Sequence, residues 1–90
     1  MGEQTSATLA VTVRYFAGAA ATAGVSDERV TVPSGSSLGE LLRSLARQHG
    51  EALERVLAVS SYLVGEVHAE TSDLLDDGAT VDVLPPFAGG

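Results

Sequence analysis

The segment from Leu38 to His49 carries the pattern that most restricts how this chain folds. Ser37 and Glu40 have the spacing of a capping box, in which the serine hydroxyl accepts a backbone N–H and the glutamate side chain bonds back to the serine N–H. Leucines then recur at helical spacing at positions 38, 41, 42 and 45, and Gly50 follows as a helix stop. The sequence therefore predicts a helix over residues 38–49 with one apolar and one polar face.

Two strands are expected before this helix. Residues 8–16 alternate apolar and polar side chains, and residues 28–32 alternate again until Pro33 ends the pattern. Between them, residues 17–23 are rich in alanine and are followed by Gly24, which is typical of a short helical turn with a glycine cap. The first two strands therefore form a hairpin whose loop contains a helical turn.

Further strands are expected after the helix. We expect a second helical piece over 51–57, then strands over 61–64 and 67–69 that flank Gly65 and Glu66. Glycine at the first position of a two-residue loop favours a type II′ turn. Asp77-Gly78 marks another turn before a last strand over 79–84, and Pro85-Pro86 ends the sheet because proline has no N–H to donate.

This order of elements predicts an α+β domain. The expected fold is a β-grasp, or ubiquitin-like, arrangement: a mixed sheet of about four to five strands with one main helix packed on one face. Ninety residues suffice for one domain with a single core. We expect a flexible N-terminal segment over 1–7, the β-grasp domain over 8–84 and a flexible reactive tail over 85–90.

Composition excludes several classes of function. The chain has no cysteine, so it holds no disulfide, no thiolate metal site and no sulfur relay of its own. A net charge of −7 argues against nucleic acid and favours a basic partner surface or simple solubility. No apolar run approaches the roughly 20 residues of a membrane span, and no leader pattern is seen, so we expect no membrane association and a cytoplasmic location.

The usual catalytic and metal-binding groupings are not expected inside the domain. His49 and His68 lack the spaced partners of a metal site, so a structural role is favoured for both. Asp73, Asp76 and Asp77 are expected to form a solvated acidic turn rather than a calcium loop. We therefore expect no metal, no bound cofactor and no catalysis by this chain alone.

The C-terminal residues are the candidate site. Pro85 and Pro86 favour an extended exit from the last strand, and Phe87 is an apolar side chain suited to a partner's pocket. Ala88, Gly89 and Gly90 follow, and glycine can enter a narrow channel because it has no Cβ. We expect residues 85–89 to bind partners and the Gly90 carboxylate to react: adenylation with ATP by a partner enzyme, then attack by a sulfur donor, would give a thiocarboxylate.

These residues resemble a known family. The ending from Val81 to Gly90, the segment from Val13 to Ala17 and the Asp77-Gly78 turn resemble the small subunit of molybdopterin synthase, a ubiquitin-like sulfur carrier. The resemblance implies activation by an enzyme related to ubiquitin-activating enzymes and delivery of sulfur to the large synthase subunit for molybdenum cofactor biosynthesis. Two features differ: Val64-Gly65 stands where the family often has Asn-Gly, and no lysine is available for a partner contact near the tail.

Three functions remain open from the sequence. The first is the molybdopterin sulfur carrier, which the two prolines before the tail favour. The second is a sulfur carrier for cysteine or thiamine biosynthesis, with the same terminal chemistry. The third is a ubiquitin-like modifier that is conjugated to other proteins through Gly90.

Overall fold

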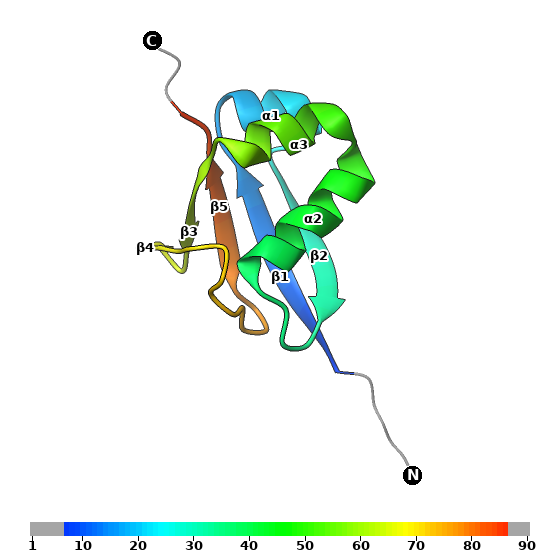
Figure 1. Ribbon diagram of the computed structural model, residues 1–90, viewed down its shortest axis with the longest axis vertical. Coiled ribbons are helices and arrows are strands. Elements are labelled where there is room, and N and C mark those ends of the chain that lie inside the picture. Colours follow the sequence, from blue (N-terminus) through cyan, green and yellow to red (C-terminus); the bar gives the residue numbers. More distant parts are fainter. Residues whose placement is uncertain (1–6, 87–90) are drawn as a thin grey trace.

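The computed structural model describes residues 7–86, and residues 1–6 and 87–90 lie outside the described part. Eight elements follow one another along the chain (Figure 1). They are β1 (Thr8–Tyr15), α1 (Gly18–Ala23), β2 (Asp27–Pro33), α2 (Leu38–His49), α3 (Glu51–Ala58), β3 (Ser61–Val64), β4 (Val67–His68) and β5 (Thr80–Leu84).

The strands form one mixed sheet in the order β2-β1-β5-β3-β4. The first and last strands, β1 and β5, lie side by side and run parallel, whereas β2 and β3 flank them antiparallel. A parallel pair cannot be joined by a tight turn, so the intervening chain has to cross over one face of the sheet. The predicted mixed sheet and β-grasp fold are confirmed, with five strands.

The described chain has three helices: the predicted main helix, α2, and the shorter α1 and α3, of which α1 is the helical turn expected over residues 17–23. Figure 1 shows α2 crossing the sheet and α1 and α3 side by side near one end of it. The capping box is present: Ser37 accepts from the Glu40 N–H, and Glu40 accepts from the Ser37 N–H. Gly50, at a φ of 103°, separates α2 from α3, because glycine tolerates a positive φ that would strain other residues. The helical piece expected over 51–57 is confirmed as α3.

The core lies between the sheet and the helices. On β1, every second residue from Leu9 to Tyr15 is buried, as the alternating pattern predicted. Val81 and Val83 of β5 are fully buried on the same side, where α2 contributes the fully buried Leu38, Leu41 and Leu45. Burying a leucine or valine side chain contributes about 1.5–3 kcal/mol, so these two central strands and the helix anchor the domain.

The β3–β4 hairpin differs from the prediction in its turn. Gly65 has a φ of 57° and Glu66 a φ of 69°, and two positive values define a type I′ turn rather than the predicted type II′ turn. The type I′ geometry matches the right-handed twist of the strands and moves Glu66 into the left-handed region. The register Val64–Val67 and Leu63–His68 follows from this two-residue loop.

Candidate functional site

The candidate tail begins at the middle of the sheet. β5 lies between β1 and β3, and its last residue, Leu84, is opposite Ser61. The Phe16 N–H donates to the Val83 carbonyl at 3.2 Å, which continues the parallel contact beyond β1. The segment after Leu84 therefore leaves the domain from β5, the central strand that pairs with β1.

Two of the predicted tail residues fall in the described part of the chain. Pro85 is half-buried and Pro86 is exposed, and neither belongs to a strand, as expected for a sheet that ends at two prolines. The other four predicted site residues, Phe87, Ala88, Gly89 and Gly90, lie outside the described residues.

An ion pair on the face of the sheet opposite the helices joins the parallel strands. Arg14 Nε lies 2.7 Å from Asp82 Oδ1, and Arg14 Nη2 lies 3.0 Å from Asp82 Oδ2. The Asp82 side chain is only 6% exposed, whereas that of Arg14 is 45% exposed. The hydrogen bond to Asp82 and the charge of that carboxylate raise the pKa of Arg14, so the guanidinium stays charged. Sequence reasoning missed this pair because it depends on β1 and β5 being neighbours.

Apolar residues lie on the same face of the sheet as this ion pair. Phe16 is 39% exposed, and its ring centroid lies 5.6 Å from the Arg14 guanidinium carbon. Leu63, opposite Asp82 on β3, and Leu84 are half-buried. We call this surface, made of Arg14, Phe16, Leu63, Asp82 and Leu84, the tail-root face. An exposed aromatic beside half-buried leucines and a fixed ion pair is typical of a surface that binds another protein.

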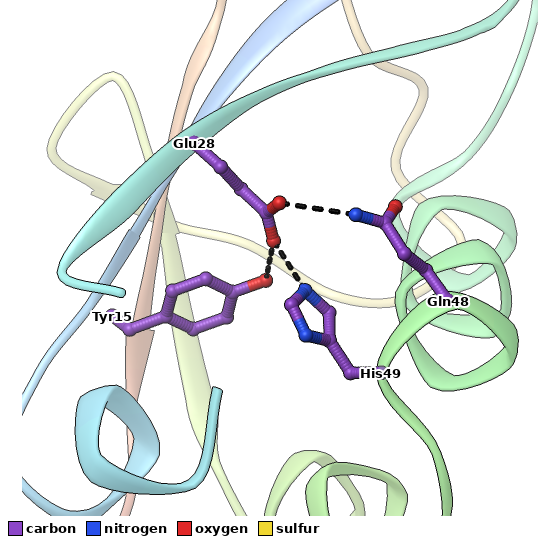
Figure 2. A network of polar contacts seen from close by, with 4 residues as sticks. All are labelled: Tyr15, Glu28, Gln48 and His49. Carbon is purple, nitrogen blue, oxygen red and sulfur yellow. Dashed lines mark hydrogen bonds and ion pairs between the residues drawn. The ribbon is translucent and has the colours of Figure 1, made fainter. Parts of the chain in front are cut away.

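A polar network ties the C-terminal end of α2 to β2 (Figure 2). Glu28 Oε2 accepts from the Tyr15 hydroxyl at 2.6 Å and lies 2.6 Å from His49 Nε2, and Glu28 Oε1 accepts from Gln48 at 3.2 Å. Tyr15 and His49 also meet edge to face, with ring centroids 6.0 Å apart. The structural role predicted for His49 is consistent with these contacts.

The network keeps its carboxylate ionised. Burial acts to raise the pKa of Glu28, but the hydrogen bonds from Tyr15 and His49 outweigh it, and the pKa lies below its ordinary value. Burial, followed by the Glu28 carboxylate, raises the pKa of Tyr15, so the phenol remains a donor. Sequence analysis did not predict this network. The available signal is that Glu28 alternates with Val30 and Val32, so its carboxylate points to the same side of β2 as these two buried valines.

The acidic turn has structural roles in the folded chain. Asp77 Oδ1 accepts from the Ala10 N–H at 2.8 Å, and Asp73 Oδ2 accepts from the Glu70 N–H at 2.9 Å. His68 pairs with Glu70 at 2.9 Å on the surface. Within residues 7–86, no three histidine or acidic side chains are placed to hold a metal ion. No helix in that same part of the chain is long and apolar enough to cross a membrane.

Comparison with known proteins identifies the family. Residues 13–90 match the ThiS family. The chain belongs to the ThiS family. This ThiS-family chain is also similar to the molybdopterin synthase sulfur carrier subunit of Chlamydomonas reinhardtii, with 28% identity over 82 residues that cover 89% of this chain and 98% of that protein. The resemblance predicted from the C-terminal residues is thereby confirmed.

Solved structures agree with this membership. A putative molybdopterin converting factor subunit 1 from Pyrococcus furiosus superposes with a TM-score of 0.80 at 26% identity, over 88% of this chain and 99% of that chain. Two further structures are less than 25% identical and show the fold alone. The small archaeal modifier protein 1 of Haloferax volcanii has a TM-score of 0.79 at 22% identity, covering 88% and 99% of the two chains. A complex of subunits 1 and 2 of molybdopterin-converting factor from Helicobacter pylori has a TM-score of 0.63 at 24% identity, covering 91% of this chain and 100% of that chain.

Proposed function

We propose that this ThiS-family chain is the sulfur carrier and small subunit of a molybdopterin synthase. The observation that carries the proposal is the glycine pair Gly89-Gly90, which ends a family match running to residue 90. The names of the relatives from Chlamydomonas reinhardtii and Pyrococcus furiosus support the same pathway. Because the chain has no cysteine, a cysteine persulfide on this chain is excluded as the carrier, which supports the carboxylate of Gly90 in that role.

The proposed chemistry takes place at the carboxylate of Gly90. A carboxylate oxygen attacks the α-phosphate of ATP on an activating enzyme, pyrophosphate leaves, and an acyl adenylate forms. A hydrosulfide anion supplied by the sulfur donor then attacks the carbonyl carbon and displaces AMP, which gives the thiocarboxylate. In the active site of the large subunit, the sulfur of this anion attacks an electrophilic carbon of the substrate and displaces a leaving group, so that a thioester joins Gly90 to the substrate. Water then cleaves the bond between the acyl carbon and the sulfur, which leaves the sulfur on the substrate and restores the Gly90 carboxylate. The need for ATP favours the cytoplasm.

The proposed partners bind the tail and the tail-root face together. Pro85 to Gly89 would lie in the partner's channel, with Phe87 in an apolar pocket, while Phe16 and Leu84 contact the partner's surface beside its entrance. The complex of subunits 1 and 2 from Helicobacter pylori supports a large-subunit partner. The charge of −7 favours a basic surface on that partner.

Purification of the chain with its partners from its own host tests the pathway. Recovery of a molybdopterin synthase large subunit supports the proposal, whereas recovery of a cysteine-forming or thiamine-forming enzyme assigns the sulfur to another pathway. The fold shared with small archaeal modifier protein 1 makes conjugation to other proteins the second candidate. Target proteins joined to Gly90 by an amide bond, with no thiocarboxylate form, would favour that candidate.

A further inference from the structure

β2 is an edge strand with one free side. The Tyr15 N–H donates to the Ser26 carbonyl, and the Ser34 N–H donates to the Ala7 carbonyl, so the even-numbered residues of this segment face β1 in the antiparallel ladder. The N–H and C=O groups of Arg29 and Thr31 therefore point to the opposite edge. No other strand of the described chain pairs with that edge. An unpaired strand edge is a ready template for an added strand.

A groove runs between this edge and α2. Its volume is about 330 Å³. One wall is formed by Thr31, Val32 and the loop 33–36, and the other by four residues of α2. These four, Glu40, Arg43, Ser44 and Arg47, recur at helical spacing and form one stripe along the groove. The groove thus combines backbone donors and acceptors on one side with charged side chains on the other.

The charge of the groove is opposite to that of the chain. Two of the five basic residues, Arg43 and Arg47, lie one helical turn apart in it, although the net charge is −7. Like charges at this spacing repel one another, and a bound anion would relieve that repulsion. Neither arginine forms an ion pair with another described residue, whereas Arg14 and Arg55 do. The single carboxylate in the stripe, Glu40, accepts from the Ser37 N–H at the loop end of the helix.

We propose that this groove binds an extended acidic segment of a partner protein, which adds to β2 as a further strand. Thr31 and Arg29 would supply main-chain hydrogen bonds, and Arg43 and Arg47 would bind the carboxylates. A second copy of the chain fits less well, because it would bring two strongly acidic molecules together and place arginines opposite arginines. β1 separates β2 from β5, so a segment bound here leaves the tail-root face open and lets two partners bind at once.

A synthetic peptide tests the site directly. The probe alternates valine and serine and ends in three aspartates, and its control carries lysines in place of the aspartates. Titration into the ¹⁵N-labelled full chain is followed by NMR. We expect the acidic probe to shift the amides of Thr31, Gly35 and Ser44 and to slow hydrogen exchange at Arg29 and Thr31, while the lysine peptide has no effect. No binding, or shifts confined to the tail-root face, would overturn the proposal.

Three variants and one control separate the two halves of the site. Arg43→Glu and Arg47→Glu should each weaken the probe about fivefold, whereas Arg55→Glu, a charge reversal on exposed α3, should change affinity less than about twofold. Thr31→Pro removes an edge donor without breaking the β1–β2 ladder, and it should abolish the slowed exchange at Arg29. If Arg55→Glu weakened probe binding as much as the groove variants do, the loss of affinity would come from the change in net charge and not from the groove. Sedimentation that shows pairing of two chains through β2 would identify a second copy as the occupant. Either result contradicts the proposal.

Discussion

His49 Nε2 lies 2.6 Å from Glu28 Oε2, so the last residue of α2 is tied to the second residue of β2. The contact bridges 21 positions of sequence and holds the end of the helix where Gly50 breaks it. Tyr15 completes the arrangement from β1. The position of α2 over the sheet thus depends on one carboxylate as well as on its leucines.

Replacing this carboxylate should destabilise the domain. Glu28→Gln keeps the shape of the side chain but weakens the hydrogen bonds from Tyr15 and His49, and we expect the free energy of unfolding to fall by about 1–2 kcal/mol at pH 7. Urea unfolding followed by circular dichroism measures the change. Glu54→Gln, on an exposed position of α3, is the matched control and should have almost no effect.

The same carboxylate predicts a dependence of stability on pH. Because the pKa of Glu28 is lowered in the folded chain, its contribution is complete above the ordinary value of 4.5 and is lost as the pH falls through the folded value. The difference in unfolding free energy between the wild type and Glu28→Gln should therefore be present at pH 6 and shrink below pH 4.5. A difference that grows on acidification would contradict the proposed network.

Mutation of the two partners of the Arg14–Asp82 ion pair should destabilise the domain to different extents. Arg14→Ala leaves the buried Asp82 carboxylate without its partner, whereas Asp82→Asn leaves an exposed guanidinium that water can solvate. We expect Arg14→Ala to lower the thermal midpoint more than Asp82→Asn does. The reverse order, measured by calorimetry on both variants, would mean that the carboxylate is not buried as described.

Ala17 is held in a conformation that suits glycine. Its φ of 50° and ψ of −128° lie in a region that costs a residue with a Cβ about 1–3 kcal/mol. Ala17→Gly should raise the free energy of unfolding by about 1 kcal/mol, net of the entropy that glycine loses on folding. Ala21→Gly, inside α1, is the control and should lower the free energy of unfolding by about the same amount.

Removal of the last residue should separate function from folding. Deleting Gly90 leaves the terminal carboxylate on Gly89, one residue short of the position proposed to carry sulfur, and the buried strands end at Leu84, six positions before Gly90. We expect sulfur transfer to be abolished while the thermal unfolding curve stays close to that of the wild type. An unfolded deletion variant would show that the C-terminal residues act in folding instead.

Local patterns predicted most of the fold. The capping box at Ser37 and Glu40 predicts the start of the main helix, and the alternation from Leu9 to Tyr15 predicts a half-buried strand. Both predictions are confirmed. The predicted type II′ turn at Gly65 is wrong because the sequence does not show that Glu66 also adopts a positive φ. That conformation depends on the twist of the paired strands.

Tertiary contacts explain what the sequence did not reveal. Arg14 and Asp82 are 68 positions apart and meet only because β1 and β5 are parallel neighbours. The groove beside Arg43 and Arg47 exists because β2 is an edge strand, which depends on the order of strands in the sheet. The glycines at 89 and 90 were predicted as the site from their chemistry, and they remain a prediction.

Intact-mass spectrometry of the protein from its own host tests the central claim most directly. We predict a form heavier than the unmodified chain by the difference between one sulfur and one oxygen, located at Gly90 by fragmentation and absent from the Gly90 deletion. Detection of only the unmodified chain and its amide-linked adducts with other proteins, in cells that are making molybdenum cofactor, would contradict the assignment as a sulfur carrier.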